Sequence, residues 1–253
     1  VSGGAPLAPE LSEWFHAAGL LVIEGYGLTE TSAPATTNTP SAFRFGTVGR
    51  AIPGAEVRIA GDGEIEVRGP GVFRGYWKDE EATRAAFTDD GWFRTGDIGE
   101  LSADGFLRIT DRKKDLIITA AGKNIAPAPI ENLLKQHRLI GQAMLHGDRR
   151  SYLTCLVTLC EEEAPLWAAE QGKPADLASL ARDPEVLEQV RAHIDAVNAL
   201  VARYESVRKW SLLPVAFTVE SGYLTPTLKL KRRRITEDFL VELEALYRGD
   251  PSA

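Results

Sequence analysis

The sequence predicts a chain of mixed class, α/β followed by α+β, because its texture changes twice. Near the N-terminus a helix pattern, an apolar stretch and a glycine-rich segment follow one another, as in an open α/β sheet. From residue 47 to 109, short apolar stretches are cut by Gly and Pro, which is typical of a small antiparallel β unit. Past residue 115, strand and helix patterns alternate. We therefore expect an α/β part, a small β-barrel subdomain at about 46–110 and a compact α+β domain at the C-terminal end.

The first region predicts one helix and one strand. Residues 9–18 have the apolar spacing of a short helix, and residues 20–23 are interpreted as a buried strand bounded by glycine. This strand delivers the segment GYGLTET, residues 25–31, at its carboxyl end. Ligands bind at the carboxyl ends of strands in open α/β sheets, so this segment is the first candidate for a site.

The middle region predicts short paired strands. Residues 64–68 alternate strictly between charged and apolar, and one helix at about 80–87 interrupts the strands, with Asp79 placed to cap its N-terminus. The charged stretch 111–115 lies between two apolar strands. Such a stretch suits an exposed linker, so we place the domain boundary there.

The last region predicts a compact domain of strands and helices. Its first elements are a strand at 116–119, a helix at 129–137 and a strand at 151–159. Asp183 and Pro184 then supply an N-cap and a first helical position, in the expected order. A further strand at 209–218 and an amphipathic helix at 235–247 complete the domain.

Composition excludes several classes of protein. The formal charge of −7 and the pI near 5.3 argue against a nucleic-acid binder that works by bulk electrostatics. The four histidines lack zinc-ligand spacing, and no apolar run is as long as a membrane span. Cys155 and Cys160 are interpreted as small buried thiols that do not pair. A cytoplasmic enzyme, or a piece of one, fits best, and the start at Val1 without Met predicts further residues upstream in a longer parent chain.

Four ordered segments carry the chemistry. They are GYGLTET at 25–31, WFRTGD at 92–97, TDRKKD at 110–115 and LTPTLKLKR at 224–232. Each alone is a turn with a few polar residues, but together they supply an aromatic face, a hydroxyl beside an acid, a lone carboxylate, an arginine and a late lysine. This pattern resembles the adenylate-forming superfamily and, within it, the long-chain fatty acyl-CoA synthetases. The resemblance covers nearly the whole chain.

The resemblance assigns roles to the first segment. Tyr26, between Gly25 and Gly27, corresponds to the tyrosine that stacks on adenine in similar enzymes, and the glycines let a planar ligand approach the backbone. Thr29 would donate to the α-phosphate, and Glu30 would be an oxygen ligand for Mg²⁺. Taken singly, the same residues are a core tyrosine and the start of a helix capped by Thr29.

Two further groups would complete the nucleotide site. Gly3, Gly4 and Ala5 resemble the family's small-residue loop beside the adenine and the acyl chain. Asp97 resembles the carboxylate that accepts hydrogen bonds from the ribose diol, and Arg112 the arginine that reaches ribose and phosphate. As isolated residues, these two would be a turn aspartate and a surface arginine.

The fourth segment carries the proposed catalytic lysine. Lys229 matches a family lysine that reaches the carboxylate and the α-phosphate, where its charge offsets the repulsion between two anions. Arg232 would help to hold this segment. The family often has Gly before this lysine, and here the residue is Leu228, as in the long-chain branch. The alternative for residues 229–234, of which five are Lys or Arg, is a solvated basic run, and contact with CoA phosphates or an anionic membrane is a third possibility.

The resemblance also implies a domain motion. Residues 1–110 would be the C-terminal end of a large α/β AMP-binding domain, and residues 116–253 a mobile lid domain. Residues 111–115 would be the hinge between them, with Lys114 as the hinge residue. Gly122 would lie in a hairpin that swings in to line the channel for the pantetheine arm of CoA.

The implied activity is that of a fatty acid–CoA ligase with ATP, CoA and Mg²⁺ as co-substrates and cofactor. The fatty acid is first converted to acyl-AMP, and the CoA thiol then displaces AMP. The family's loop for the β- and γ-phosphates lies upstream of this sequence, so we expect the 253 residues alone to be inactive or severely impaired. Two alternatives stay open: a fatty acyl-AMP ligase that loads a carrier protein, and a non-catalytic nucleotide or acyl-CoA binding module. No motif specifies the acyl chain length or an oligomeric state.

Overall fold

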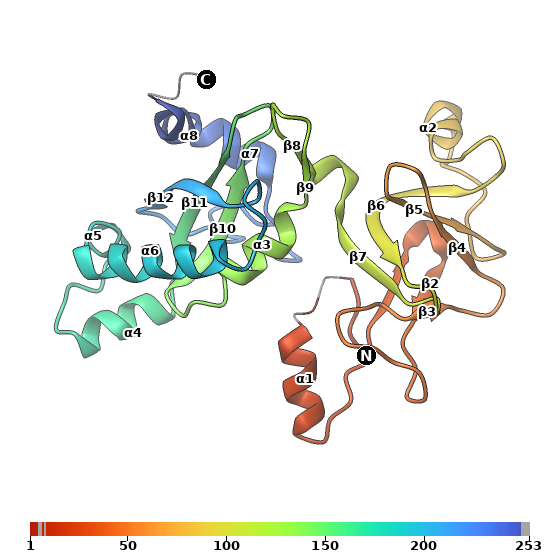
Figure 1. The fold of residues 1–253 in the computed structure, drawn as a ribbon, viewed down its shortest axis with the longest axis horizontal. Helices are drawn as coiled ribbons and strands as arrows, with labels where there is room; N and C mark the ends of the chain where they lie inside the picture. The colour runs from red at the N-terminus through yellow and green to blue at the C-terminus, as the bar shows by residue number, and fades with distance from the viewer. Residues whose placement is uncertain (5–6, 8, 249–253) are drawn as a thin grey trace. The chain divides into compact units, whose positions relative to one another are not determined.

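The computed structural model describes residues 1–4, 7 and 9–248, and the chain divides into two compact units, Val1–Asp115 and Leu116–Ala253 (Figure 1). Each unit has its own hydrophobic core. The fold class predicted from the sequence, α/β and α+β, is confirmed.

Unit 1 contains two small antiparallel sheets. The first has the order β1-β2-β3 and the second the order β4-β5-β6-β7. The strands are β1 (Gly25–Leu28), β2 (Ala33–Thr37), β3 (Arg50–Ala51), β4 (Glu56–Ile59), β5 (Glu64–Arg68), β6 (Phe93–Leu101) and β7 (Leu107–Arg112). The helices are α1 (Pro9–Ala17) and α2 (Glu80–Ala85), with short 3₁₀ turns η1 (Thr29–Thr31) and η2 (Lys113–Asp115).

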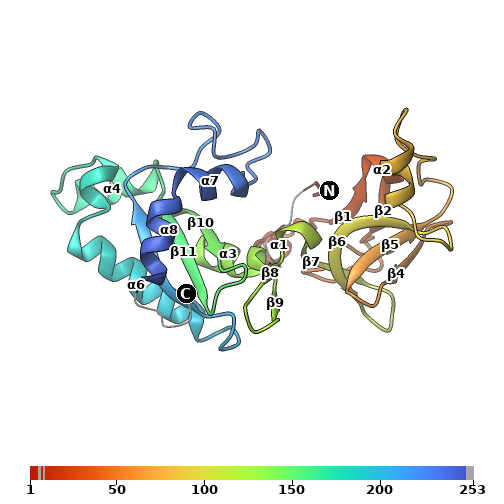
Figure 2. The same ribbon diagram turned by 90° about the horizontal axis from the view of Figure 1, so that it is seen from above.

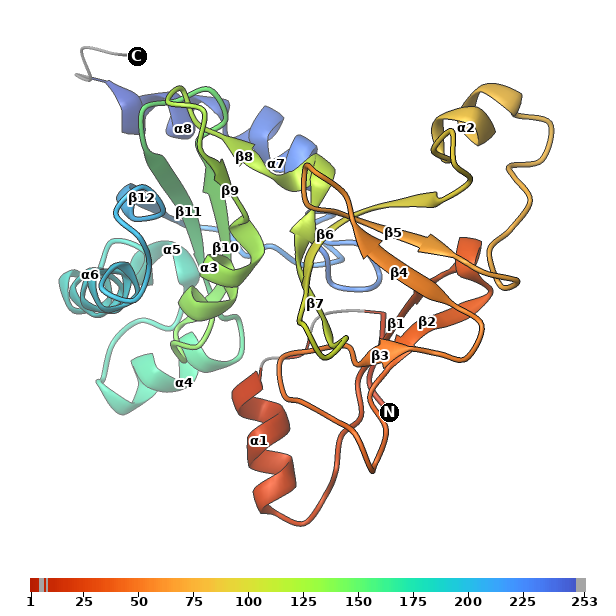
Figure 3. The same cartoon turned by 45° about the vertical axis from the view of Figure 1, so that its right-hand side comes forward.

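The two sheets of unit 1 are joined through Leu107. Its carbonyl accepts a hydrogen bond from the amide of Val48 and its amide donates to the carbonyl of Gly49, both at 2.8 Å. The strands thus follow one another in a strongly twisted, curled arrangement, a half-barrel rather than a closed cylinder (Figure 3). Ala35, Ile65, Val67, Leu107 and the ring of Tyr26 form its core.

Two predictions for unit 1 have different outcomes. Asp79 caps α2 as expected, because its carboxylate accepts the amide of Ala82 at 2.9 Å. The strand predicted at 20–23 is wrong: the strand is Gly25–Leu28 itself. A strand exists only through pairing, and β1 pairs along its whole length with β2, whereas Leu20 is 60% exposed.

Unit 2 is a sheet of three strands covered by helices on both faces (Figure 2). The sheet has the order β10-β11-β12, with β10 antiparallel and β12 parallel to β11. The strands are β8 (Ile117–Ile118), β9 (Asn124–Ile125), β10 (Ile140–His146), β11 (Leu153–Leu159) and β12 (Val207–Leu213). The helices are α3 (Pro127–Leu134), α4 (Glu163–Glu170), α5 (Leu177–Leu180), α6 (Pro184–Asn198), α7 (Arg232–Asp238) and α8 (Leu240–Tyr247).

Strand β11 explains the layers of unit 2. Every residue of this strand is buried, as expected for a central strand covered on both faces. Cys155 and Val157 face the core shared with α3, α4 and α6, whereas Leu156 faces the core shared with α7 and α8. Cys160 lies just beyond the strand, half-buried, and both cysteines are free.

The C-terminal end of unit 2 departs from the prediction. Instead of one helix at 235–247 there are two, α7 and α8, separated at Phe239, whose φ of −113° leaves the helical range. The ring of Phe239 packs against Phe217 and Tyr223 at this point. Asp183 caps α6 and Pro184 occupies its first turn, as predicted.

Candidate active site

The segment Thr95–Gly96–Asp97 forms a bulge in β6. Glu64 of β5 pairs with Ile98, and Glu66, two residues on, pairs with Arg94, so three residues of β6 face one of β5. Gly96 has a φ of +72°, which favours glycine. Bulges of this kind re-aim a side chain and often lie next to active sites.

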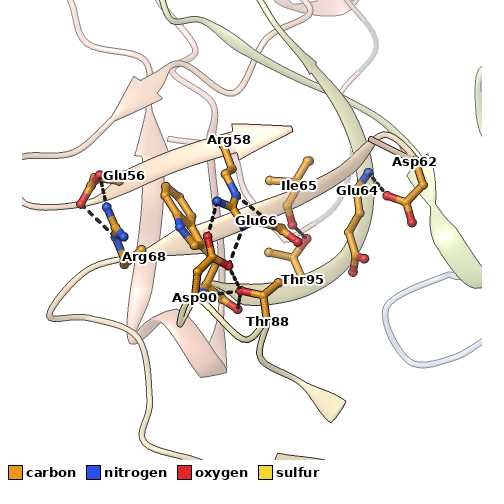
Figure 4. Close-up of polar contacts among 11 residues, drawn as sticks. Glu56, Arg58, Asp62, Glu64, Ile65, Glu66, Arg68, Thr88, Asp90 and Thr95 are labelled. Atoms are coloured by element: carbon orange, nitrogen blue, oxygen red, sulfur yellow. Dashed lines mark hydrogen bonds and ion pairs between the residues drawn. The ribbon is translucent and has the colours of Figure 1, made fainter. Parts of the chain in front are cut away.

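Side chains replace the ladder hydrogen bonds that the bulge loses. The hydroxyl of Thr95 donates to the carbonyl of Ile65 at 2.7 Å, a contact visible in Figure 4, and accepts the amide of Asp97 at 3.1 Å. The amide of Gly96 donates to Oε1 of Glu64 at 2.9 Å. The backbone of the bulge is therefore held in one conformation before any ligand arrives.

The bulge places Asp97 between Tyr26 and Arg112. The Tyr26 hydroxyl donates to Oδ2 of Asp97 at 2.6 Å, and Nε of Arg112 lies 3.2 Å from Oδ1. Asp97 and Arg112 are direct cross-strand partners in β6 and β7. Three of the residues predicted for the nucleotide site thus meet within one unit.

Burial differs sharply within this group. The side chain of Asp97 is 5% exposed and that of Arg112 is 47% exposed, so Arg112 is the member that faces solvent. Burial, together with the Asp97 carboxylate, raises the pKa of Tyr26 far above its usual range. Tyr26 therefore stays protonated and acts as the donor. Its ring contributes to the core, and its role in stacking on adenine stays a prediction.

The turn that follows Tyr26 carries Thr29 and Glu30. The N-cap position of the 3₁₀ turn η1 is Leu28, not Thr29, and the Thr31 hydroxyl accepts the amide of Leu28 at 2.8 Å. Thr29 is exposed and its hydroxyl is not used in the cap. The alternative interpretation of Thr29 as an N-cap is wrong, which leaves that hydroxyl available to a ligand.

Gly27 is required by close backbone approach. A Cβ there would lie 2.2 Å from the carbonyl oxygen of Ala33, in the neighbouring strand. Gly25 is less tightly constrained, with 3.3 Å between a Cβ and the carbonyl oxygen of Thr36. The first glycine of the segment therefore tolerates change better than the second.

Glu30 is the candidate ligand for Mg²⁺. Its Oε1 accepts the hydroxyl of Tyr76 at 3.1 Å, and its side chain is half-buried. Within residues 1–4, 7 and 9–248 there is no cluster of three or more His, Cys, Asp or Glu that could hold a metal ion alone. One carboxylate fits a Mg²⁺ ion that is held mainly by phosphates and water.

The predicted small-residue loop is described only in part. Gly3 lies beside the first strand, where a Cβ would be 3.3 Å from the carbonyl oxygen of Gly25, and Gly4 has a φ of +82°. Ser2 pairs with Glu24 in a parallel bridge. Ala5 lies outside the described residues, so its predicted role stays a prediction.

The predicted hinge, residues 111–115, contains two neighbouring lysines that differ in their contacts. Nζ of Lys113 lies 2.8 Å from Glu64 and 2.7 Å from Asp62. Its neighbour Lys114 is exposed, and among the described residues no hydrogen bond or ion pair holds its side chain. The contrast between these two neighbours is compatible with a hinge at Lys114, which stays a prediction.

In unit 2, Lys229 is presented on a tight turn. Thr225 pairs with Lys229 across this turn, through a backbone hydrogen bond of 2.8 Å, and its hydroxyl accepts the Lys229 amide at 3.1 Å. Leu228 has a φ of +60°, the left-handed region that favours glycine, and is 67% exposed. This explains in physical terms why glycine suits the position before the lysine.

The basic run 229–234 is not a uniform solvated surface. Arg232 makes a bidentate ion pair with the buried Glu131 at 2.7 and 2.6 Å. Arg233 and Arg234 pair with Glu237 and Asp238 along α7. In the described part of the chain, Lys229 and Lys231 are the members of the run whose side chains remain exposed and without an ion pair.

Gly122 lies at the tip of a hairpin. Strands β8 and β9 pair around it, and its amide donates to the carbonyl of Thr119 at 2.8 Å. Its φ is +72°, and a Cβ there would contact nothing within 4 Å. The hairpin tip is thus open to an approaching ligand, and its contact with CoA stays a prediction.

Two buried glutamates were missed in the sequence. Glu64 supports the bulge and Glu131 holds both Arg232 and the amide of Leu145, at 2.7 Å. They lie in segments predicted as a strand, 64–68, and a helix, 129–137, with no role assigned to either. The strict alternation in β5 contained a signal, because Glu64 and Glu66 share a face that turns out to be buried.

Comparison with known proteins establishes the family. Residues 1–77 match the model described as AMP-binding enzyme, and residues 114–251 match the model described as AMP-binding enzyme C-terminal domain. The chain therefore belongs to the AMP-binding enzyme family, and the resemblance read from its motifs is confirmed.

Within this family, the chain is similar to curated proteins named as long-chain acyl-CoA ligases or synthetases. The chain is 46% identical over 249 residues to a long-chain-fatty-acid–CoA ligase of Mycobacterium tuberculosis, with 98% of this chain and 41% of the relative covered. It is 37% identical over 265 residues to the peroxisomal long chain acyl-CoA synthetase 7 of Arabidopsis thaliana, with 97% and 38% covered. It thus spans about two fifths of the length of the curated relatives it matches.

A solved structure shows the same fold with a nucleotide. O-succinylbenzoate coenzyme A synthetase from Bacillus subtilis, in complex with ATP and magnesium ion, superimposes with a TM-score of 0.68 at 28% identity. The match covers 92% of this chain and 45% of that chain.

None of the described helices is long and apolar enough to cross a membrane.

Proposed function

We propose that this chain supplies the nucleotide cradle and the catalytic lysine of an ATP-dependent long-chain fatty acid–CoA ligase. The observation that carries the proposal is the buried Asp97, held on a bulge by Tyr26 and Arg112. A carboxylate fixed in this way is ready to accept two hydrogen bonds from a ribose diol. The names of the relatives support the fatty acid and CoA as substrates.

The first half-reaction joins the fatty acid to AMP. The carboxylate attacks the α-phosphorus of ATP, an acyl–oxygen–phosphorus linkage forms, and pyrophosphate leaves. Asp97 accepts the ribose hydroxyls, while the half-exposed Arg112 moves aside from Asp97 enough to share it with the ribose. Each carboxylate oxygen has a second lone pair for this purpose.

Thr29 and Glu30 would serve the phosphate. The free hydroxyl of Thr29 donates to an α-phosphate oxygen, and Glu30 supplies one oxygen ligand to Mg²⁺. When bound, the metal ion neutralises charge that develops on the phosphate oxygens. Tyr76 orients the Glu30 carboxylate by donating to the other oxygen.

Lys229 would serve the adenylation step. Its exposed ammonium, on a turn anchored by Arg232, offsets the repulsion between the carboxylate and the α-phosphate. For the second half-reaction, unit 2 turns about Lys114, withdraws Lys229 and presents the Gly122 hairpin to the pantetheine arm. The CoA sulfur then attacks the acyl carbon and AMP leaves. Lys231 is available for CoA phosphates or for an anionic membrane surface.

Nucleotide binding is tested on the 253-residue chain by thermal shift with AMP. A ligand present at 100 times its Kd stabilises the folded state by about 2.7 kcal/mol. Asp97→Asn keeps the shape and the Tyr26 contact but loses the charge, and we expect it to abolish the AMP-dependent shift. Glu66→Gln, a neighbouring buried carboxylate outside the site, is the matched control. An unchanged shift in Asp97→Asn would refute the nucleotide assignment.

The role of Lys229 is tested by separating the half-reactions in a chain completed to the length of its relatives. Lys229→Ala is expected to depress acyl-AMP formation far more than thioester formation from supplied acyl-AMP. In the adenylation step, Lys231→Ala, the other exposed lysine of the run, controls for the loss of a positive charge. Equal losses in both half-reactions would remove Lys229 from the adenylation step.

A further inference from the structure

Glu64 touches both the Asp97 bulge and Lys113, which lies in the proposed hinge segment 111–115 directly before Lys114. Its Oε1 accepts the amide of Gly96 at 2.9 Å, and its Oε2 lies 2.8 Å from Nζ of Lys113. The residue as a whole is only 5% exposed. A carboxylate at this depth is costly unless each oxygen has a partner, and here each one does.

The contact with Gly96 fixes the direction of Asp97. The bulge removes the amide of Gly96 from the strand ladder, so Glu64 is the group that satisfies this donor. Without the Glu64 carboxylate, the bulge would relax towards regular pairing. A one-residue shift in register moves each side chain to the opposite face of the sheet. Asp97, the next residue, would then leave Tyr26 and Arg112.

The contact with Lys113 fixes the position of the Glu64 carboxylate. Lys113 is the first residue of η2, directly after Arg112 and directly before Lys114. It bonds Asp62 as well as Glu64, and these two carboxylates hold the pKa of Lys113 above its usual range. The lysine therefore stays charged at any physiological pH.

We propose that Glu64 is a positioning residue that couples the Asp97 bulge to the turn at Lys113, so that the nucleotide site and the start of the hinge are held by one side chain. The proposal rests on the proposed function for the meaning of Asp97 and Lys114. Glu64 itself touches no nucleotide; it acts through the backbone of Gly96.

The same strand offers a matched control. Glu66, two residues along β5, is also 5% exposed and also pairs with a half-exposed cation, Arg58, at 2.6 Å. Arg58 in turn bonds Asp90 (Figure 4). Lys113 likewise bonds Asp62, at 2.7 Å. In the described part of the chain, the side-chain hydrogen bonds and ion pairs of Glu66 and Arg58 join them to one another and to Asp90, not to the bulge. The two pairs therefore match in depth, charge and strand and differ in the contact that carries the proposal.

The first test measures amide hydrogen exchange of Gly96 and Asp97 in the 253-residue chain without nucleotide. Lys113→Met removes the charge that holds Glu64, and exchange at Gly96 is expected to rise about tenfold, which corresponds to about 1.4 kcal/mol. Arg58→Met should leave exchange at Gly96 unchanged. Lys113→Arg keeps the positive charge, so exchange at Gly96 should stay at the wild-type rate. Equal effects of Lys113→Met and Arg58→Met, or none from either, would overturn the proposal.

The second test measures AMP affinity by calorimetry in the same variants. Lys113→Met and Glu64→Gln should each weaken binding about tenfold. The double variant should be no weaker than either single one, because both break the same chain of contacts. Independent, additive losses would contradict coupling. If the wild-type chain failed to bind AMP, the proposed function would fail while the exchange result still decided the role of Glu64.

Discussion

The two units hold their functional groups in opposite ways. In unit 1, Asp97 and Tyr26 are buried and bonded to one another, on backbone that side chains brace. In unit 2, Lys229 is exposed on a turn that contains a strained Leu228, and the nearest fixed point is the Arg232–Glu131 pair three residues away. This difference fits the two proposed roles. Groups that bind a nucleotide need to be preorganised, whereas a lysine that moves into and out of the site needs an exposed position on a turn that is itself anchored.

The largest loss of stability is expected when the Arg232–Glu131 ion pair, which anchors the turn that carries Lys229, is removed. Arg232→Met leaves the carboxylate of Glu131 buried without its cation and should destabilise unit 2 by about 3 kcal/mol. Urea unfolding followed by the fluorescence of Trp167 and Trp210 measures this change. Arg233→Met, at an exposed pair with Glu237, should change stability little. If both variants behaved alike, the Arg232 pair would not be the anchor of the turn.

The next effect concerns the preorganised side of the comparison. Tyr26→Phe removes the donor to Asp97 and leaves a buried acceptor unsatisfied, so we expect unit 1 to lose about 2 kcal/mol and AMP affinity to fall. The matched control is Tyr76→Phe, which removes a more exposed hydroxyl from Glu30. Unfolding midpoints and AMP titrations check both. A Tyr26→Phe variant that bound AMP as well as the wild type would show that Asp97 needs no such bracing.

A smaller effect sharpens the account of the lysine turn. Leu228 at φ +60° carries a penalty of about 1 kcal/mol that glycine avoids. Leu228→Gly should therefore stabilise unit 2 by up to about 1 kcal/mol, and Leu228→Val, β-branched, should destabilise it by a similar amount. Urea midpoints of the pair give the answer. If Leu228→Gly and Leu228→Val were equally stable, the left-handed conformation at position 228 would carry no penalty.

The smallest effect is a dependence on pH that belongs to unit 2. Burial lowers the pKa values of His137 and His146, so the folded unit binds fewer protons than the unfolded chain below pH 6.5. Stability is then present above pH 6.5 and declines as the pH falls towards the folded-state values. Replacing both histidines with Gln should flatten this slope between pH 7.5 and 5.5. An unchanged slope would assign the acid sensitivity to other groups.

Local chemistry made part of this structure predictable. The caps at Asp79 and Asp183 and the proline after the second follow from contacts within three residues, and all were read correctly. The strand at Gly25 and the break at Phe239 were not. The first depends on pairing with the next strand, β2, and the second on packing against Phe217.

The same limit applies to the site. Motifs picked out Tyr26, Asp97 and Arg112, and the structure brings these three together. The bulge that positions them depends on Glu64, which lies 32 residues from Gly96 and 49 from Lys113. The alternation in β5 shows that Glu64 and Glu66 share one face, but it does not show which distant residues Glu64 contacts.

The most direct test of the division between the two units is calorimetric titration of the 253-residue chain with AMP. The wild type and Lys229→Ala are predicted to bind AMP with the same affinity, because unit 1 carries the cradle. Asp97→Asn is predicted to lose binding by at least about a hundredfold, equal to about 2.7 kcal/mol. Loss of AMP binding in Lys229→Ala with full binding in Asp97→Asn would contradict the account.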